Sequence, residues 1–495
     1  MFEVAELGHK VSKADYNEKV PALRTQLLTV QQQLRDHDYS VIILISGVDG
    51  GGKGEVINLL NEWLDPRFMR TNAYDSPSDE EKERPVFWRY WRTMPAKGTI
   101  GIYVGSWYSN PIAQRVYDKI SDAELKVRLT QIKELEQELA DDNTLIIKCW
   151  LHLKQEQQKK RLKQLEKNPE TAWQVTDRDK KHLKMYATFA GVAEDVLNDT
   201  SSAQNPWLIV EGSDIRYSSL TVGQHILDKI KSHIENCEQK HNTPAPTQLE
   251  KVIHGNQPSL LDKLDLSQNL DKDQYNEQLN FYQGKLYKLA RQAHKKKISS
   301  ILVFEGWDAG GKGGAIRRLT HAMDARNYQV IPIAAPTEEE RMQHYLWRFW
   351  RHMPRAGRVT IYDRSWYGRV LVERVEGFAT ESEWTRAYPE IRNFEEALTE
   401  HGIGLLKFWL HIDPDEQLRR FKAREQISYK QHKITEEDYR NREKWDEYSL
   451  AVNDMVARTS TQSSLWTLIE ANDKRYARIK VLQTYCAKLE EMLDK

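Results

Sequence analysis

The stretch VFEGWDAGGKGG (residues 303–314) decides how the rest of the chain is interpreted. It keeps the G-x4-G-K spacing of a phosphate-binding loop, and it lies between an apolar run and a stretch of helical character. Gly313, however, stands where the usual loop has a Ser or Thr hydroxyl that binds Mg²⁺. A second version, LISGVDGGGKGE, occurs at 44–55. Two questions follow: what replaces the missing hydroxyl, and whether both loops are active.

The two loops belong to one long internal repeat. Adding 259 to the number of Gly47 gives Gly306, and the same offset turns Lys53 into Lys312. It also aligns WRYWRTMPAKGTIGIYVGSWY (88–108) with WRFWRHMPRAGRVTIYDRSWY (347–367), with 12 of 21 positions identical. A unit of this length is a duplicated domain rather than a solenoid repeat. We expect an N-terminal domain at 1–236, a proline-containing linker at 237–259, and a C-terminal domain at 260–495.

Composition excludes several classes of protein. The chain has 495 residues, of which 39% are hydrophobic and 29% charged, as in a globular protein with a buried core. Lys plus Arg and Asp plus Glu are both 73, so a globally basic nucleic-acid binder is disfavoured. Three cysteines without metal spacing favour a reducing compartment. Since neither a signal peptide nor a membrane span is recognisable, we expect a cytoplasmic protein without membrane or nucleic-acid partners.

Short apolar runs alternate with charged helical patterns in both repeats. Each repeat opens with a helical segment, at 16–36 and 275–296. The apolar runs that follow lie at 41–45, 101–104, 145–153 and 207–211, and again at 300–304, 360–363, 405–412 and 466–470. This alternation predicts an α/β fold, a buried parallel sheet flanked by helices, in each domain. Ligands then belong at the carboxyl ends of the strands, where both glycine loops fall.

The second loop predicts a site for phosphoryl transfer. Its glycines allow backbone N–H groups to surround phosphate oxygens, and Lys312 adds a positive charge. Because Gly313 has no hydroxyl, we expect Mg²⁺ (or Mn²⁺) to be held by Asp308 within the loop and by Asp363 at the end of a neighbouring strand. Arg364 and Arg369 follow in DRSWYGR and complete the charged surroundings. The expected phosphate-binding glycines are Gly306, Gly310, Gly311 and Gly313.

The motifs GWDAGGKGG, WRFWRHMPRAG, DRSWYGRVLVERV and KWDEYSLAVNDM together resemble the family-2 polyphosphate kinases, over both repeats. The resemblance implies a thymidylate-kinase-like P-loop domain with a helical lid, and Mg²⁺-assisted transfer of the terminal phosphoryl group of inorganic polyphosphate to a nucleotide. The tandem arrangement resembles the members that use AMP. By position, the catalytic residues implied are Asp308, Lys312, Asp363 and Arg364, and the phosphate-binding residues are Arg369, Lys433, Arg442 and Lys444. Gly368 departs from the Asn of many members.

A polyphosphate donor requires a basic groove. The candidates are Arg317, Arg318, Arg348, Arg351, Arg355 and Arg358. If the stretch around 350 is helical, Arg348, Arg351 and Arg355 share one face; a solvated basic face is the alternative. Trp347 and Trp350 are expected in the core, and Thr337 with Glu340 as a helix capping box.

The first repeat keeps Asp49 and Lys53 but has lost the strand-end charges. Val104 replaces the Asp, Gly105 the Arg, and Asn110 the second Arg. In the lid, Leu183 stands opposite Arg442 and Ala187 opposite Asp446. One electrostatic donor in such a site contributes about 3 kcal/mol to transition-state stabilisation, so we expect this repeat to be catalytically inactive.

Three other functions remain open on the sequence alone. The enzyme could convert ADP to ATP, it could use ATP as donor on the same fold, or the chain could be a non-enzymatic polyphosphate or nucleotide sensor. Homo-oligomerisation is a further expectation from the resemblance.

Overall fold

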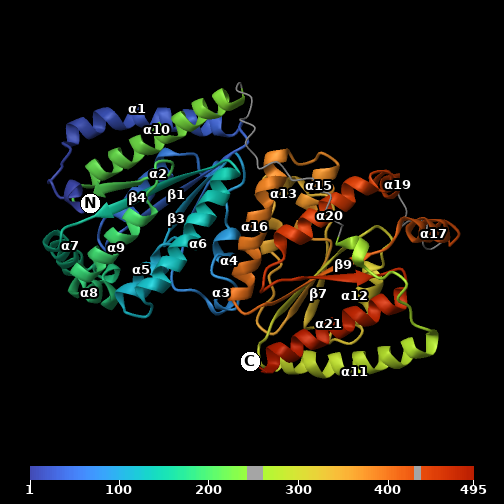
Figure 1. Cartoon of the computed structure of the whole chain (residues 1–495). Coiled ribbons are helices and arrows are strands. Elements are labelled where there is room, and N and C mark those ends of the chain that lie inside the picture. Colours follow the sequence, from blue (N-terminus) through green and yellow to red (C-terminus); the bar gives the residue numbers. More distant parts are fainter. Residues whose placement is uncertain (242–259, 428–435, 495) are drawn as a thin grey trace. The chain divides into compact units, whose positions relative to one another are not determined.

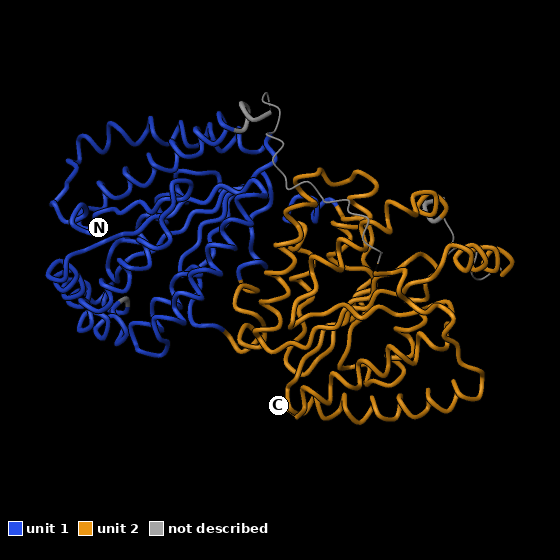
Figure 2. Tube along the Cα trace, viewed as in Figure 1, with its two compact units in different colours: residues 1–77, 90–246, 338–344 blue, residues 78–89, 247–337, 345–495 orange. Residues whose placement is uncertain are grey.

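The structure, a computed structural model of the chain, describes residues 1–241, 260–427 and 436–494. It divides into two compact units (Figure 2). Unit 1 consists of residues 1–77, 90–246 and 338–344, and unit 2 of residues 78–89, 247–337 and 345–495. Each unit therefore contains most of one sequence repeat and a short segment of the other. The linker expected at 237–259 falls largely outside the described residues, and helix α10 continues to His241.

Unit 1 is built on a five-stranded parallel sheet with the order β2-β3-β1-β4-β5. The strands are β1 (Ser40–Gly47), β2 (Met69–Ala73), β3 (Ile100–Val104), β4 (Thr144–His152) and β5 (Trp207–Glu211). The long helices are α1 (Lys13–Leu34), α2 (Lys53–Trp63), α5 (Ser109–Val116), α6 (Asp122–Asp141), α7 (Gln155–Lys167), α8 (Asp177–Lys184), α9 (Tyr186–Thr200) and α10 (Ile215–His241). Short helices are α3 (Asp79–Lys82) and α4 (Trp88–Trp91).

Unit 2 repeats this sheet with the order β10-β9-β6-β8-β7. Its strands are β6 (Ser300–Gly306), β7 (Tyr328–Pro332), β8 (Val359–Asp363), β9 (Gly404–His411) and β10 (Trp466–Glu470). The helices are α11 (Lys272–Lys295), α12 (Lys312–Thr320), α14 (Trp347–Trp350), α15 (Val372–Val375), α16 (Glu381–Glu400), α17 (Pro414–Glu425), α19 (Glu436–Glu443), α20 (Trp445–Thr459) and α21 (Lys474–Asp494). Helix α13 (Glu338–Arg341) belongs to unit 1.

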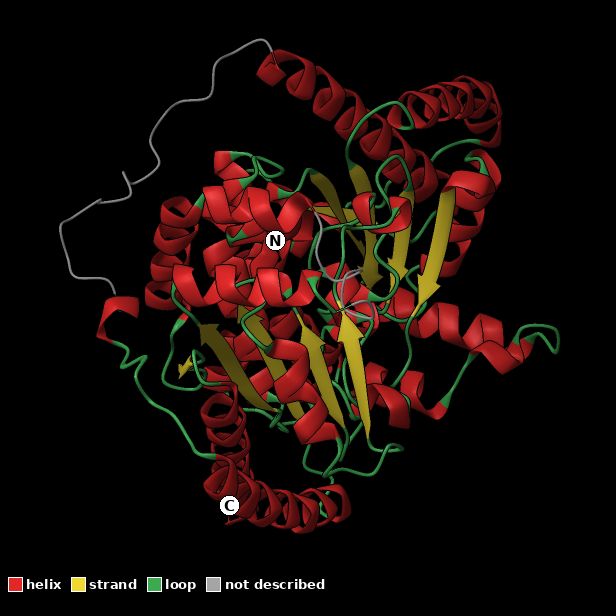
Figure 3. Cartoon of the chain, turned by 90° about the vertical axis from the view of Figure 1, so that its right-hand side faces the viewer, coloured by secondary structure: helices red, strands yellow, loops and turns green. Residues whose placement is uncertain are grey.

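The central strands form because their apolar runs are buried on both faces. All nine residues of β4 and all eight of β9 are buried, so helices must cover both sides of each sheet, as Figure 3 shows. In unit 1, α1, α2 and α10 supply the core of one face, and α6 packs against β4. In unit 2, α11, α12 and α21 pack together, and α16 packs against β9.

The predicted α/β class, the expected opening helices and all eight expected strands are confirmed. The sequence did not indicate β2 and β7, because these edge strands are short and half exposed and carry no continuous apolar run. Helix α13 begins directly after Thr337, while its capping box stays a prediction. Within the described parts of the chain, no helix combines the length and apolar character needed to cross a bilayer.

Candidate active site

The glycine loop of unit 2 connects β6 to α12 at the carboxyl edge of the sheet (Figure 1). Gly306 has φ of 145°, and a Cβ atom there would lie 2.5 Å from the carbonyl oxygen of Leu410. Only glycine therefore permits the close approach of the loop to β9. Lys312 Nζ donates to the carbonyl oxygens of Gly306 and Trp307, the latter at 3.4 Å. The amino group thus lies over its own loop, as a phosphate-binding lysine requires.

Asp308 is the charged centre of the loop. Its Oδ1 accepts a hydrogen bond from Arg364 Nη2 at 3.0 Å, and its Oδ2 accepts one from Asn441 Nδ2 at 3.0 Å. Burial by itself would raise the pKa of Asp308, but the charges of Lys312 and Arg364 and these hydrogen bonds lower it below its ordinary value. The side chain is therefore an anion at neutral pH. The contact with Asn441 also brings α19, from the expected lid, over the loop.

Asp363 ends β8 and faces the place where the usual loop has its hydroxyl. A Cβ atom added to Gly313 would lie 4.0 Å from Asp363 Oδ2. A Ser side chain at position 313 would point at this carboxylate. Asp363 therefore borders the space in which the usual loop places its hydroxyl. Among the described residues no group of three or more His, Cys, Asp or Glu side chains could hold a metal. Two carboxylates fit Mg²⁺ nonetheless, because this ion usually takes one or two carboxylates and completes its shell with water and substrate phosphates.

Glu305 is a site residue that we did not predict from the sequence. It is 6% exposed, and its Oε1 accepts a hydrogen bond from Ser365 Oγ at 2.8 Å. Burial raises its pKa to about 7, against the opposing influence of Lys312, Ser365 and Arg364. Glu305 and Asp308 both line a cavity of about 70 Å³ between the loop and α19. Burial therefore favours the protonated form of the Glu305 carboxyl.

Arg364 occupies a strained backbone position. Its φ is 65°, in the left-handed region that costs a non-glycine residue about 1 kcal/mol or more. The equivalent Gly105 of unit 1 has φ of 71°, and a Cβ atom there would lie 2.2 Å from the carbonyl oxygen of Tyr74. Unit 2 retains an arginine where the backbone favours glycine, and that arginine contacts Asp308.

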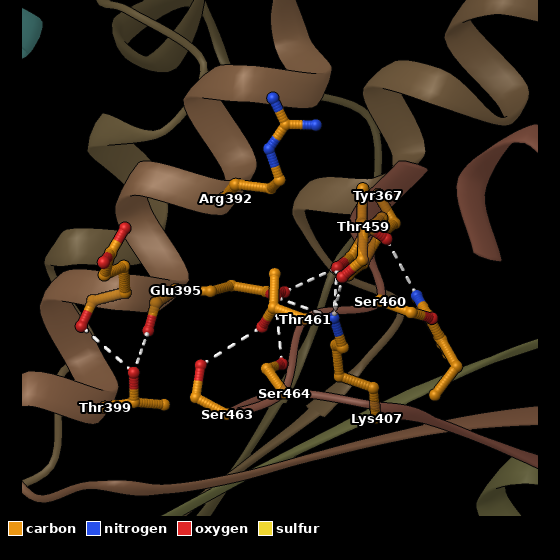
Figure 4. A network of polar contacts seen from close by, with 12 residues as sticks. Tyr367, Arg392, Glu395, Thr399, Lys407, Thr459, Ser460, Thr461, Ser463 and Ser464 are labelled. Carbon is orange, nitrogen blue, oxygen red and sulfur yellow. Dashed lines mark hydrogen bonds and ion pairs between the residues drawn. The ribbon is translucent and has the colours of Figure 1, made fainter. Parts of the chain in front are cut away.

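A buried polar network holds the loop that carries Asp363 and Arg364 (Figure 4). Glu395 Oε1 accepts hydrogen bonds from Trp366 Nε1 at 3.1 Å and from Tyr367 Oη at 2.6 Å. Glu395 Oε2 pairs with Lys407 Nζ at 2.7 Å, and both side chains are at most 2% exposed. Lys407 also donates to the carbonyl oxygen of Thr459 at 2.8 Å. The loop after β8 is thereby fixed to α16, β9 and α20.

Three of the other expected phosphate-binding side chains contact protein groups outside the glycine loop. Arg369 Nε pairs with Glu373 Oε2 at 3.2 Å, and Lys444 Nζ with Glu376 Oε2 at 3.1 Å. Arg442 donates to the carbonyl oxygen of Pro414 at 2.5 Å. Lys433 lies outside the described residues. A direct role of these four side chains in binding phosphate stays a prediction.

The prediction that the arginines around residue 350 share one helical face was wrong. Helix α14 ends at Trp350, so Arg348, Arg351 and Arg355 do not share one helix. Arg355 Nε instead pairs with Glu83 Oε2 at 2.7 Å. Arg358 precedes β8, at the edge of the sheet opposite to the glycine loop. The expectation that Trp347 and Trp350 belong to the core is confirmed, since they are 7% and 3% exposed.

In unit 1 the loop lysine makes the same contacts as in unit 2, but the loop carboxylate has a different partner. Lys53 Nζ donates to the carbonyl oxygens of Gly47 at 2.9 Å and Val48 at 2.8 Å. Asp49 Oδ2 pairs with His182 Nδ1 at 2.5 Å, and His182 occupies the position equivalent to Asn441. A histidine thus supplies a partner to a carboxylate that has lost its arginine.

Comparison with known proteins gives the family. A family model described as Polyphosphate kinase 2 matches residues 10–238 and again residues 269–495. The chain belongs to the polyphosphate kinase 2 family. A family member from Pseudomonas aeruginosa, named polyphosphate:AMP phosphotransferase, is 50% identical over 485 residues, which cover 98% of this chain and 97% of that protein. One of the same name from Acinetobacter johnsonii is 37% identical over 464 residues, covering 92% of each chain.

The fold is shared by a solved member of the family. A crystal structure of a Pseudomonas aeruginosa protein described as polyphosphate kinase 2 matches with a TM-score of 0.88 and 47% identity, covering 100% of this chain and 99% of that one. The expected tandem arrangement of two polyphosphate kinase 2 domains is therefore confirmed.

Some site residues of this polyphosphate kinase 2 domain had no recognisable signal in the sequence. Asn441 lies in a polar helical stretch, and Arg420 in another, yet Arg420 Nη1 donates to the loop carbonyls of Ala309 at 2.9 Å and Gly310 at 3.1 Å. Glu305 could have been found, because a carboxylate next to the first glycine interrupts an apolar strand.

Proposed function

We propose that the chain transfers the terminal phosphoryl group of inorganic polyphosphate to AMP, giving ADP, and that the transfer takes place in unit 2. The acceptor assignment is supported by the relatives that match nearly the full tandem chain, which are named polyphosphate:AMP phosphotransferases. One observation assigns the reaction to unit 2, namely the contact between Asp308 and Arg364 beside Lys312. Unit 1 cannot form this site, because Val104 and Gly105 stand at the positions equivalent to Asp363 and Arg364.

The residues of unit 2 act by positioning and by charge. Lys312 and Arg364 would neutralise the oxygens of the transferring phosphate, and the loop N–H groups would orient it. Asp308 keeps Arg364 in place through its hydrogen bond. Asn441 would close the site when α19 lies over the loop, which excludes water from a phosphoryl group that could otherwise be hydrolysed.

We further propose that Mg²⁺, or Mn²⁺ in its place, is held by Asp308 and Asp363. When bound, the ion supplies charge neutralisation between adjacent phosphate groups. The support is the space at Gly313 that faces Asp363, together with the ionised state of Asp308. Because only two protein ligands are offered, the ion should bind together with the phosphate donor rather than before it.

Unit 1 is proposed to be catalytically inactive. Unit 1 has Val104 and Gly105 in place of the carboxylate and the guanidinium, and the steric conflict of a Cβ atom at Gly105 with Tyr74 opposes a side chain at that position. Of the two carboxylates proposed to hold the metal in unit 2, the equivalent positions of unit 1 keep only Asp49, which pairs with His182. A cytoplasmic location and a homo-oligomer stay predictions.

The test is a nucleotide assay with four substrate pairs. Purified chain is incubated with AMP or ADP, each with long-chain polyphosphate or ATP, and products are separated by chromatography. We expect ADP from AMP with polyphosphate at a rate well above the other pairs. Turnover supported only by ATP would overturn the donor assignment, and faster conversion of ADP to ATP would overturn the acceptor.

A further inference from the structure

A second cavity in unit 2 lies away from the glycine loop. Its volume is about 610 Å³, and it is bounded by the end of α11, the loop before β7 and the first residues of β6 and β8. Ser300 and Val359 line it, whereas the glycine loop and Asp363 follow the opposite ends of the same strands. A strand of seven residues spans about 23 Å, so the cavity is distinct from the active site.

The cavity exists because unit 2 has small side chains where unit 1 has large ones. Ala290 and Ala293 line it, and the equivalent residues of unit 1 are Gln31 and Leu34. Leu34 is fully buried, and Gln31 is 1% exposed. The Gln31 amide donates to the carbonyl oxygen of Asp65 at 3.0 Å and accepts from its N–H at 2.7 Å. Alanine cannot repeat these contacts, so the space stays open beside Asp324, the equivalent of Asp65.

The rim of the cavity is cationic only in unit 2. Arg291, Lys295, Arg326 and Arg358 all line the cavity and are exposed. The equivalent residues of unit 1 are Gln32, Asp36, Arg67 and Thr99, whose formal charges sum to zero. One acid faces the rim, Asp324, which pairs with Arg326 Nη2 at 2.6 Å. Unit 1 forms the same helices and strands without these positive charges. The fold therefore does not require the cationic rim of unit 2.

The lining combines this rim with apolar and aromatic surface. Tyr287 stands at the cavity with 54% of its surface exposed, and Ile298, Met323 and Val359 supply aliphatic surface. The volume lies within the roughly 300–1,000 Å³ typical of small-molecule sites. An apolar floor suits a flat ring, and arginine and lysine at the mouth suit phosphate oxygens.

We propose that this cavity is a second binding site, for a nucleoside phosphate, separate from the catalytic centre. Bare phosphate chains would use the cationic rim but leave the apolar floor without a partner. The assignment goes beyond the proposed function and does not depend on it, because neither the glycine loop nor Asp363 takes part.

The test is photoaffinity labelling of the full chain with 8-azido-ADP, followed by mapping of the labelled peptides. We expect label in the peptides spanning 287–298 and 323–328, in addition to label at the active site. Two variants copy unit 1: Ala290→Gln fills the cavity, and Lys295→Asp reverses a rim charge. Each should reduce labelling of these peptides by about tenfold, and the active-site label should persist. Lys288→Asp, an exposed charge change on α11 outside the lining, should have no effect.

Several outcomes decide against the proposal. Absence of label from both peptides would overturn it, as would label that survives Ala290→Gln and Lys295→Asp. Competition distinguishes the ring from the phosphates: unlabelled ADP should displace the label at lower concentration than inorganic tripolyphosphate. Equal displacement by tripolyphosphate would show a site for bare phosphate chains and would overturn the nucleoside assignment.

Discussion

The buried ion pair Glu395–Lys407 can be tested by mutation with an internal control, because unit 1 contains an equivalent pair. In unit 1 the same bonds join Glu136 to Lys148 Nζ at 2.8 Å, to Trp107 Nε1 at 3.1 Å and to Tyr108 Oη at 2.6 Å. Only the network of unit 2 holds a loop with Asp and Arg at its start. Glu395→Gln removes this ion pair from unit 2, which we propose to be catalytic. Glu136→Gln removes the equivalent ion pair from unit 1, which we propose to be inactive.

The magnitude follows from what Glu395→Gln leaves behind. A Gln oxygen can still accept from Trp366 and Tyr367, but its NH₂ group then faces Lys407, whose side chain is fully buried. Removing one partner of a buried ion pair costs about 3–5 kcal/mol, a large share of a domain's stability of about 5–15 kcal/mol. Burial lowers the pKa of Lys407, and the Glu395 charge opposes that shift. Without the carboxylate the lysine loses its proton more easily, so the destabilisation should shrink as pH rises.

The assay combines urea unfolding, followed by tryptophan fluorescence, with ADP formation measured where both variants remain folded. Both variants should lose about 3–5 kcal/mol in the unit that carries the change. Turnover should fall by about tenfold or more in Glu395→Gln, because the loop carrying Asp363 loosens, and should persist in Glu136→Gln. A loss of stability below about 1 kcal/mol in Glu395→Gln would refute the energetic argument. Equal loss of turnover in the two variants would refute the positioning argument.

Three further changes test the site. Asp363→Asn should lower ADP formation by about a hundredfold or more without changing the urea midpoint. Asp49→Asn should change turnover by less than about twofold, since unit 1 contributes no chemistry; a silent enzyme would disprove this. Burial raises the pKa of Glu305 from 4.5 to about 7, so the native state binds the extra proton and stability falls as pH rises through this window. In metal-free buffer Glu305→Gln should abolish that fall, about 3 kcal/mol between pH 4.5 and 8, and an unchanged pH profile would contradict it.

The sequence predicted the central strands and the glycine loop because their signals are local. Continuous apolar runs such as that of β1 are typical of buried strands, and the G-x4-G-K spacing around Lys312 is typical of a loop that surrounds phosphate. The duplication added a comparison of two copies, which showed that Val104 and Gly105 lack the charges of Asp363 and Arg364.

What the tertiary structure decided depends on contacts between residues far apart in the chain. Asn441 and Arg420 contact the glycine loop across more than 100 positions, and polar residues on a helix give no sign of such a partner. The arginines at 348, 351 and 355 have helical spacing, but the helix ends at Trp350. The cavity beside Ala290 is equally invisible, because an alanine in a helix indicates open space only when the residues facing it are known. Sequence specifies which elements form, whereas burial and partner choice emerge only when the elements pack.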